Sequence, residues 1–128
     1  MVAGPRGTVL LVEDDDSMRK AIERLLEEGG YDCAAYKTAE PLLAECVDEQ
    51  SVCLISDLKL PGMSGLDLLA ALRAKGISLP FILITGHDAP GLRQEAMGRG
   101  ATAYLAKPFR GKSLLEAVGA AVERRPQA

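Results

Sequence analysis

The sequence predicts one α/β domain of three layers, in which a doubly wound, five-stranded parallel sheet carries helices on both faces. Short apolar runs recur along the chain and are bounded by polar or turn residues, which is typical of buried strands. The clearest runs are VLLV at 9–12, VCLIS at 52–56, FILI at 81–84 and AYLA at 103–106. Helix-length segments separate these runs, and this alternation favours a parallel sheet between two layers of helices.

Strands are expected at 8–13, 31–37, 52–56, 80–84 and 102–106. The second is the weakest, because Tyr31, Cys33 and Ala35 alternate with Asp32 and Ala34 and do not form a continuous apolar run. Alternation with a period of two fits a strand that is covered on one face only. We therefore expect this strand at an edge of the sheet.

Five helices are expected between and after the strands. Short side-chain oxygens accept hydrogen bonds from the free N–H groups at the start of a helix. Asp16 or Ser17 is therefore expected to cap the first helix, Thr38 the second and Ser64 the third.

The helix expected at 88–99 is the weakest, because this segment contains Pro90, Gly91 and Gly98. A glycine inside a helix costs about 1 kcal/mol relative to alanine. Its apolar stripe is thin, and regions with few buried contacts open most easily. Two interpretations stay open: a marginal helix without a further role, or an element that shifts when the neighbouring site changes charge.

The composition fits a globular domain with its own core. The chain has 128 residues, 48% of them hydrophobic and 26% charged, which suits one domain over 1–128 with a core from about 8 to 124. The net charge is −3, and the pair Arg124-Arg125 is too short to form a basic face. Direct binding of nucleic acid by this domain is therefore not expected.

The cysteines and the start of the chain favour a cytoplasmic protein without a membrane segment. No segment reaches the roughly 20 apolar residues that span a bilayer, and MVAGPRG lacks the apolar core of a signal peptide. Cys33, Cys46 and Cys53 form an odd set without a CxxC spacing, which disfavours a disulfide framework or a zinc site. We interpret them as small buried apolar residues in a reducing compartment.

Polar residues follow four of the predicted strands at the point where each strand ends. Glu13 and Asp14 follow the first, Asp57 the third, Thr85 the fourth and Lys107 the fifth. Ligands of open parallel sheets bind just outside the carboxyl ends of the strands. The sequence therefore predicts three carboxylates, a hydroxyl and an ammonium group at one edge of the sheet.

This set of groups favours a site for a divalent cation and a phosphoryl group. Clustered carboxylates repel one another unless a cation joins them, and Mg²⁺ prefers oxygen ligands. Three negative charges, two positive charges from the metal and one from Lys107 sum to zero, which leaves the metal and the ammonium group able to attract a phosphoryl group. A positioned aspartate such as Asp57 can attack phosphorus and form an aspartyl phosphate. Thr85 supplies a hydroxyl for a phosphoryl oxygen.

Four motifs together give the sequence a specific resemblance to a known family. They are LLVEDD at 10–15, SDLKLPGMSG at 56–65, ITG at 84–86 and LAKPF at 105–109. From about Thr8 to Arg124, the chain resembles the receiver domain of two-component response regulators. The resemblance implies a flavodoxin-like (CheY-like) sheet of order 2-1-3-4-5, with the first and third strands side by side at a switch point. A cis peptide bond is expected before Pro108.

The resemblance also implies a role for each residue of the site. Asp57 would be the phosphoacceptor, and Lys107 would pair with the phosphoryl group. Asp14 would bind Mg²⁺ or Mn²⁺ directly and Glu13 would bind it through water. Asp57 and the backbone carbonyl of Lys59 would complete the protein ligands of the metal.

Thr85 and Tyr104 would form a switch pair, in which the hydroxyl moves toward the phosphate and the ring turns inward behind it. Without the resemblance, Tyr104 would be an ordinary residue on the face of the sheet. The family more often has aspartate at position 13, so the longer Glu13 could alter metal affinity. Lys59 and His87 lie two residues after the phosphoacceptor and the switch threonine, where related proteins set the lifetime of the phosphate. The alternative for both is an exposed loop residue.

The function expected from this resemblance is that of a signalling switch. Asp57 would accept a phosphoryl group from a sensor histidine kinase or a histidine phosphotransfer protein. The phosphate would then change the surface of the fourth helix, fifth strand and fifth helix, through which the domain could form a homodimer. No output domain is visible after Arg125, so either a single-domain regulator or a piece of a longer protein is expected. The ITGH segment at 84–87 is similar to receivers joined to helix-turn-helix DNA-binding domains.

Three alternatives come from other functional classes. A phosphohydrolase with an aspartyl-phosphate intermediate would need a second acid two residues after the nucleophile, where this chain has Lys59. A receiver-like adaptor that never takes phosphate would lack part of the acid, threonine and lysine set, which is complete here. A nucleotide-binding domain is disfavoured because no GxGxxG motif follows the first strand. We therefore expect a domain that catalyses only its own phosphorylation and dephosphorylation, without turnover of a separate substrate.

Overall fold

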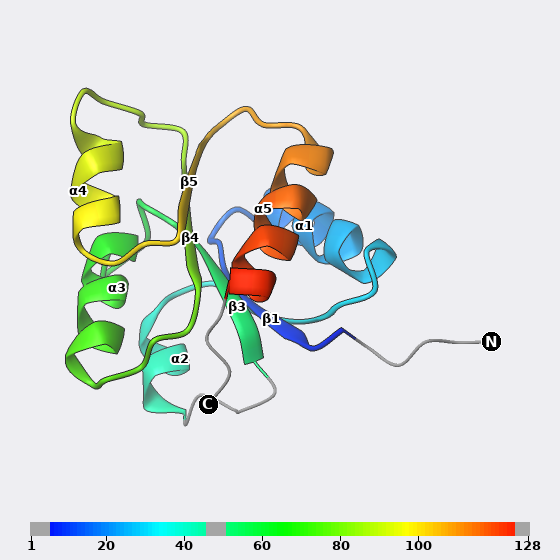
Figure 1. Cartoon of the computed structure of the whole chain (residues 1–128), viewed down its shortest axis with the longest axis horizontal. Helices are drawn as coiled ribbons and strands as arrows, with labels where there is room; N and C mark the ends of the chain where they lie inside the picture. The colour runs from blue at the N-terminus through cyan, green and yellow to red at the C-terminus, as the bar shows by residue number, and fades with distance from the viewer. Residues whose placement is uncertain (1–5, 46–50, 125–128) are drawn as a thin grey trace.

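A five-stranded parallel sheet forms the centre of the computed structural model, which describes residues 6–45 and 51–124. Helices lie on both sides of this sheet (Figure 1). The strands are β1 (Thr8–Val12), β2 (Asp32–Tyr36), β3 (Ser51–Asp57), β4 (Phe81–Thr85) and β5 (Ala103–Ala106). The helices are α1 (Asp16–Glu28), α2 (Glu40–Ala44), α3 (Gly65–Ala74), α4 (Leu92–Gly98) and α5 (Gly111–Arg124). The alternation of strands and helices confirms the predicted fold class.

The strand order β2-β1-β3-β4-β5 confirms the topology that the resemblance implied. β2 lies at one edge and is only partly buried, as its alternating sequence predicted. At the carboxyl ends, β1 and β3 pair with Val12 beside Ser56, and β4 and β5 pair with Thr85 beside Ala106. These strands therefore end along one line, and the residues that follow them are neighbours in space.

Alternate side chains of the strands enter two separate cores, one on each face of the sheet. α1 and α5 cover one core, which includes Leu11 and Ile55. α2, α3 and α4 cover the other, which includes Leu10 and Leu54. A shift of one residue in strand register would move every side chain of that strand to the opposite face of the sheet. Burial of the apolar side chains therefore also decides the side of the sheet toward which the residues after each strand point.

The predicted cap of α1 is wrong by one residue. Asp15, which has an extended backbone, is the cap, and its carboxylate accepts a hydrogen bond of 2.9 Å from the Met18 N–H. Asp16 is already helical, and its carboxylate pairs with the Arg19 guanidinium at 2.6 Å. Ser17 lies within the first turn. A run of three aspartates allowed several caps, and the pairing of Asp16 with Arg19 leaves this role to Asp15.

The predicted cap of α2 is also wrong. The helix begins at Glu40, and its N-cap residue is Ala39, which makes no side-chain hydrogen bond. Thr38 therefore lies one residue too early. Ala39 is fully buried, so packing of this residue against the core places the start of the helix. Pro41 stands in the first turn, as its missing N–H predicted.

α4 is shorter than the predicted segment 88–99, because the chain preceding it cannot continue the helix. Pro90 precedes Gly91, whose φ of +82° is the left-handed conformation that favours glycine. Among the residues of α4, all of which are described, Ala96 alone is buried. The thin apolar stripe expected from the sequence is therefore confirmed.

Of the two described cysteines, Cys53 is buried as expected, whereas Cys33 is only half-buried. Cys33 and Cys53 are both free. Burial raises the pKa of each thiol to about 12, so both stay protonated at neutral pH and react slowly. Cys46 lies outside the described residues.

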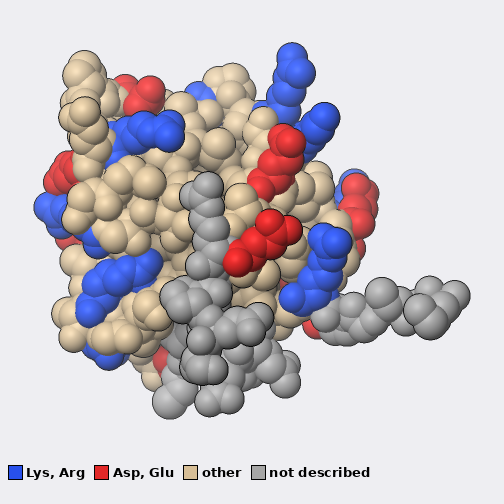
Figure 2. Space-filling view, viewed as in Figure 1, with Lys and Arg blue, Asp and Glu red and all other residues tan. Residues whose placement is uncertain are grey.

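Charged side chains of both signs are spread over the face that α4, β5 and α5 form (Figure 2). Along α4, the Arg99 guanidinium pairs with the Glu95 carboxylate at 2.9 Å. Mixed charges of this kind produce little net field over a surface. In the part of the chain that the structure describes, no helix has the length and apolar character needed to cross a membrane.

Ser64 caps α3, as predicted, and forms a capping box. The Ser64 hydroxyl accepts from the Asp67 N–H at 3.1 Å, and the Asp67 carboxylate accepts from the Ser64 N–H at 3.2 Å. We expect Ser64→Ala to lower the free energy of unfolding by about 1 kcal/mol, because one N–H group at the helix start loses its partner. Urea denaturation followed by circular dichroism measures this change. Ser78→Ala, at an exposed position before β4, is the control, and equal midpoints for the two variants would contradict the role of the cap.

Candidate functional site

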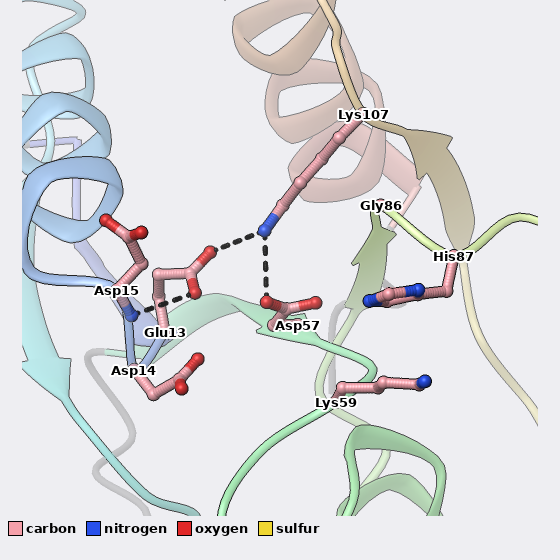
Figure 3. A pocket seen from close by; sticks show the side chains of 8 residues that line it. All are labelled: Glu13, Asp14, Asp15, Asp57, Lys59, Gly86, His87 and Lys107. Carbon is pink, nitrogen blue, oxygen red and sulfur yellow. Dashed lines mark hydrogen bonds and ion pairs between the residues drawn. The ribbon is translucent and has the colours of Figure 1, made fainter.

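An open pocket of about 310 Å³ lies where the strands end. It is lined by Glu13, Asp14, Asp15, Asp57, Lys59, Gly86, His87 and Lys107. In Figure 3, the acids of the β1–α1 loop stand on one side of Asp57, and Lys59 and His87 stand on the other. Six of the eight residues proposed from the sequence therefore come together in this pocket.

The Lys107 ammonium group joins two carboxylates across the pocket. Its Nζ donates to Glu13 Oε1 at 2.9 Å and to Asp57 Oδ2 at 3.0 Å. Both acids are buried, Glu13 completely, so water screens their repulsion poorly and the ammonium group offsets it. The peptide bond between Lys107 and Pro108 is cis, as predicted. One cation from the end of β5 thus holds together acids that follow β1 and end β3.

The pKa values of these groups reflect their contacts. Burial is the main cause that raises the pKa of Glu13; the hydrogen bond from Lys107 opposes it, and the charge of Asp57 adds to it. Burial by itself would lower the pKa of Lys107, but the bonds to Glu13 and Asp57 outweigh burial and raise this pKa. Lys107 therefore stays charged at neutral pH, and a further cation beside Glu13 would favour its ionised form.

Glu13, Asp14 and Asp57 could hold a hard divalent cation between them. Each offers a carboxylate oxygen, and these three oxygens lie within 4.8 Å of one another. Asp14 is exposed, whereas the other two acids are buried. Lys59 lines the same pocket. Several oxygen donors with room for water are what Mg²⁺ and Mn²⁺ prefer, so the residues present fit the predicted metal.

The sequence did not predict two groups that hold Glu13. The Asp15 N–H donates to Glu13 Oε2 at 3.2 Å. Arg19, which is 9% exposed, donates to the backbone carbonyl of Glu13 at 3.0 Å. The position of Asp15 in an acidic run before a helix could have indicated its contact with Glu13. Nothing in the sequence indicated the contact of Arg19, since an arginine three residues after Asp16 suggests an exposed ion pair on a helix surface.

The start of α3 lies very close to the end of β3. A Cβ atom on Gly65 would lie 2.2 Å from the carbonyl oxygen of Asp57, so no side chain fits at this position. The Gly65 N–H donates to the Leu58 carbonyl at 2.8 Å, and the Leu58 N–H donates to the Ile84 carbonyl at 2.9 Å. α3 therefore starts directly against the backbone of Asp57 and holds it in place.

Thr85 and Tyr104 are not among the residues that line the pocket. Thr85 is fully buried, and its hydroxyl accepts a hydrogen bond of 2.9 Å from the His87 N–H. Tyr104 is also buried, on the side of the sheet that α4 covers, and its hydroxyl donates to Asp88 Oδ1 at 2.5 Å. Burial and this bond raise the pKa of Tyr104 to about 12. The role of the two residues as a switch pair stays a prediction.

Comparison with known proteins agrees with this geometry. Residues 9–119 match the family model described as the response regulator receiver domain. Nodulation protein W of Bradyrhizobium diazoefficiens is 40% identical over 122 residues, which are 95% of this chain and 54% of that protein. The FixJ-N crystal structure has a TM-score of 0.86 at 34% identity, and the match covers 100% of both chains. The receiver domain of the Francisella response regulator 1452 has a TM-score of 0.87 at 26% identity, covering 93% of this chain and 98% of that one.

The chain spans about half the length of some curated relatives and about a quarter of others. The similarity therefore concerns one domain of these proteins. The family match, the strand order and the acids gathered around a lysine all point to the same conclusion. This chain belongs to the family of response regulator receiver domains, which act in two-component systems.

Proposed function

We propose that Asp57 accepts a phosphoryl group from a sensor histidine kinase or a histidine phosphotransfer protein. The observation that supports this best is the position of Asp57 in an open pocket, bonded to Lys107 and beside Glu13 and Asp14. Asp57 is 7% exposed, so its carboxylate meets the pocket and little bulk water. A phosphoryl donor that enters this pocket would reach a nucleophile already surrounded by groups that stabilise phosphate.

In the proposed transfer, a carboxylate oxygen of Asp57 forms a bond to phosphorus while the bond between phosphorus and the donor nitrogen breaks. The electron pair of the broken bond stays on the imidazole of the donor histidine. Lys107 already reaches Asp57 Oδ2 at 3.0 Å, so a small movement brings its ammonium group to a phosphoryl oxygen. Glu13, Asp14, Asp57 and the Lys59 carbonyl would hold Mg²⁺ or Mn²⁺. When bound, the metal supplies positive charge beside the transferring oxygens.

Thr85 and Tyr104 would carry the change from the phosphate to the surface. A phosphoryl oxygen offers the Thr85 hydroxyl a new partner, and that hydroxyl now accepts from the His87 N–H. Tyr104 is bonded to the same β4–α4 loop through Asp88. α4 buries only Ala96, so its displacement would break few apolar contacts. The surface of α4, β5 and α5 would change, and a homodimer could form there.

The proposed domain turns over no separate substrate. Lys59 stands two residues after Asp57, where a phosphohydrolase would need an acid, and a charged ammonium group cannot take a proton from water. Sustained release of phosphate from p-nitrophenyl phosphate would contradict this part of the proposal. We place the domain in the cytoplasm, and the free thiols of Cys33 and Cys53 agree with a reducing compartment.

Asp57→Asn should abolish labelling of the protein by acetyl phosphate and Mg²⁺, because an amide lacks the carboxylate oxygen that attacks phosphorus. Intact-mass measurement detects the phosphoryl group that is gained. Asp32→Asn, which changes an exposed acid at the start of β2, is the matched control and should be labelled like the wild type. Undiminished labelling of Asp57→Asn would refute the assignment.

Replacing Lys59 and His87 by alanine should shorten the lifetime of the phosphate several-fold. Both side chains are exposed and stand on the same side of Asp57 at the opening of the pocket (Figure 3). Their removal would open a path for the water that attacks phosphorus. The decay of radiolabelled phosphoprotein measures the lifetime, with Lys112→Ala on α5 as a control for the loss of an exposed cation. If the double variant decays at the wild-type rate, the two residues are ordinary loop residues.

Beryllofluoride with Mg²⁺, which imitates the phosphoryl group on Asp57, should increase self-association of the domain. The mixed charges over α4, β5 and α5 allow two copies to pair opposite signs across a two-fold axis (Figure 2). Analytical ultracentrifugation with and without beryllofluoride measures the effect, and Asp57→Asn should show no change. The same sedimentation coefficient for the wild type under both conditions would rule out a dimer of the activated form.

A further inference from the structure

We propose that Glu40, at the start of α2, is a positioning residue for the β3–α3 loop and thereby for metal binding in the pocket. Its carboxylate Oε2 accepts a hydrogen bond of 3.0 Å from the Met63 N–H, 23 residues further along the chain. The inference rests on the proposed function, in which the carbonyl of Lys59 in this loop is a metal ligand. Glu40 itself does not line the pocket, so its effect would pass through the loop.

Backbone hydrogen bonds hold the two ends of the loop. The Leu58 N–H donates to the Ile84 carbonyl at 2.9 Å, and the Gly65 N–H donates to the Leu58 carbonyl at 2.8 Å. Between these ends, the structure gives the fully described segment 59–63 a single hydrogen bond, the one to Glu40. The part of the loop that carries the proposed metal ligand therefore has one polar contact that limits its motion.

Gly62 shows how closely the carboxylate approaches the loop. Its φ of +77° is a left-handed conformation, and a Cβ atom there would lie 2.6 Å from Glu40 Oε2. A side chain at this position would strain the backbone and force the Glu40 carboxylate to move. Although Glu40 is exposed, its carboxylate lies close to Gly62 and accepts from the Met63 N–H, so it meets the loop at two adjacent residues.

Glu40 could affect a bound cation by position or by charge, and one substitution separates the two. Alanine removes both the acceptor and the negative charge. Glutamine removes the charge but keeps a side-chain oxygen that can accept from the Met63 N–H. If position matters, Glu40→Gln resembles the wild type; if charge matters, it resembles Glu40→Ala.

The test compares the wild type, Glu40→Ala and Glu40→Gln in two measurements that do not involve phosphate. Hydrogen–deuterium exchange of residues 58–64 without metal reports the motion of the loop, and calorimetric titration with MgCl₂ reports metal affinity. We expect Glu40→Ala to speed exchange of the loop amides and to weaken Mg²⁺ binding by about threefold to tenfold. Glu40→Gln should stay close to the wild type. Glu28→Ala, which removes an exposed acid at the end of α1, controls for the change in net charge.

Unchanged exchange of the loop in Glu40→Ala would overturn the positioning role. Equal losses of Mg²⁺ affinity in Glu40→Ala and Glu40→Gln would assign the effect to charge and would also overturn it. If the wild type binds no Mg²⁺, the proposed effect of Glu40 on metal binding fails together with the proposed function. The exchange data would still decide whether Glu40 holds the loop. As a second variant, Gly62→Ala should speed exchange of the loop amides in the wild-type background. It should speed exchange less in the Glu40→Ala background, where the neighbouring carboxylate is absent.

Discussion

An ammonium group between two buried carboxylates determines the arrangement of the site. Glu13 and Asp57 lie beside each other at the ends of neighbouring strands, and burial removes most of the water that would screen their repulsion. Lys107 reaches both from the end of β5, at 2.9 and 3.0 Å. Asp14, which is exposed, adds a third carboxylate beside them. The site is thus held together by the protein alone and still carries an excess of negative charge for a divalent ion.

Contacts from other elements also hold the backbone around this cluster. Arg19 donates to the carbonyl of Glu13, and Gly65 brings the start of α3 against the carbonyl of Asp57. The β4–α4 loop lies between the pocket and the face of the sheet that α4 covers, because His87 lines the pocket and Asp88 accepts a hydrogen bond from the Tyr104 hydroxyl. This loop leads into α4, a fully described helix in which Ala96 is the single buried residue.

Sequence reasoning succeeded where a feature depends on the local pattern. Four strands were predicted because each is an apolar run that ends at a polar or turn residue, and the second was predicted from its alternating residues. Ser64 was predicted as a cap because its hydroxyl stands directly before the helix. Sequence reasoning failed at the starts of α1 and α2, because contacts beyond the local sequence decide where these helices begin. The pairing of Asp16 with Arg19 leaves the cap of α1 to Asp15. At α2, burial of Ala39 places the start of the helix.

By itself, the sequence determined the fold class and the groups that gather at one edge of the sheet, because parallel strands bring their carboxyl ends together whatever lies between them. Only the tertiary structure decided that Lys107 bonds both buried acids, that Thr85 lies outside the pocket lining, that Arg19 donates to the Glu13 carbonyl and that Glu40 accepts from the Met63 N–H. These contacts depend on strand register and on distances between segments up to 94 residues apart. No local pattern of residues encodes such distances.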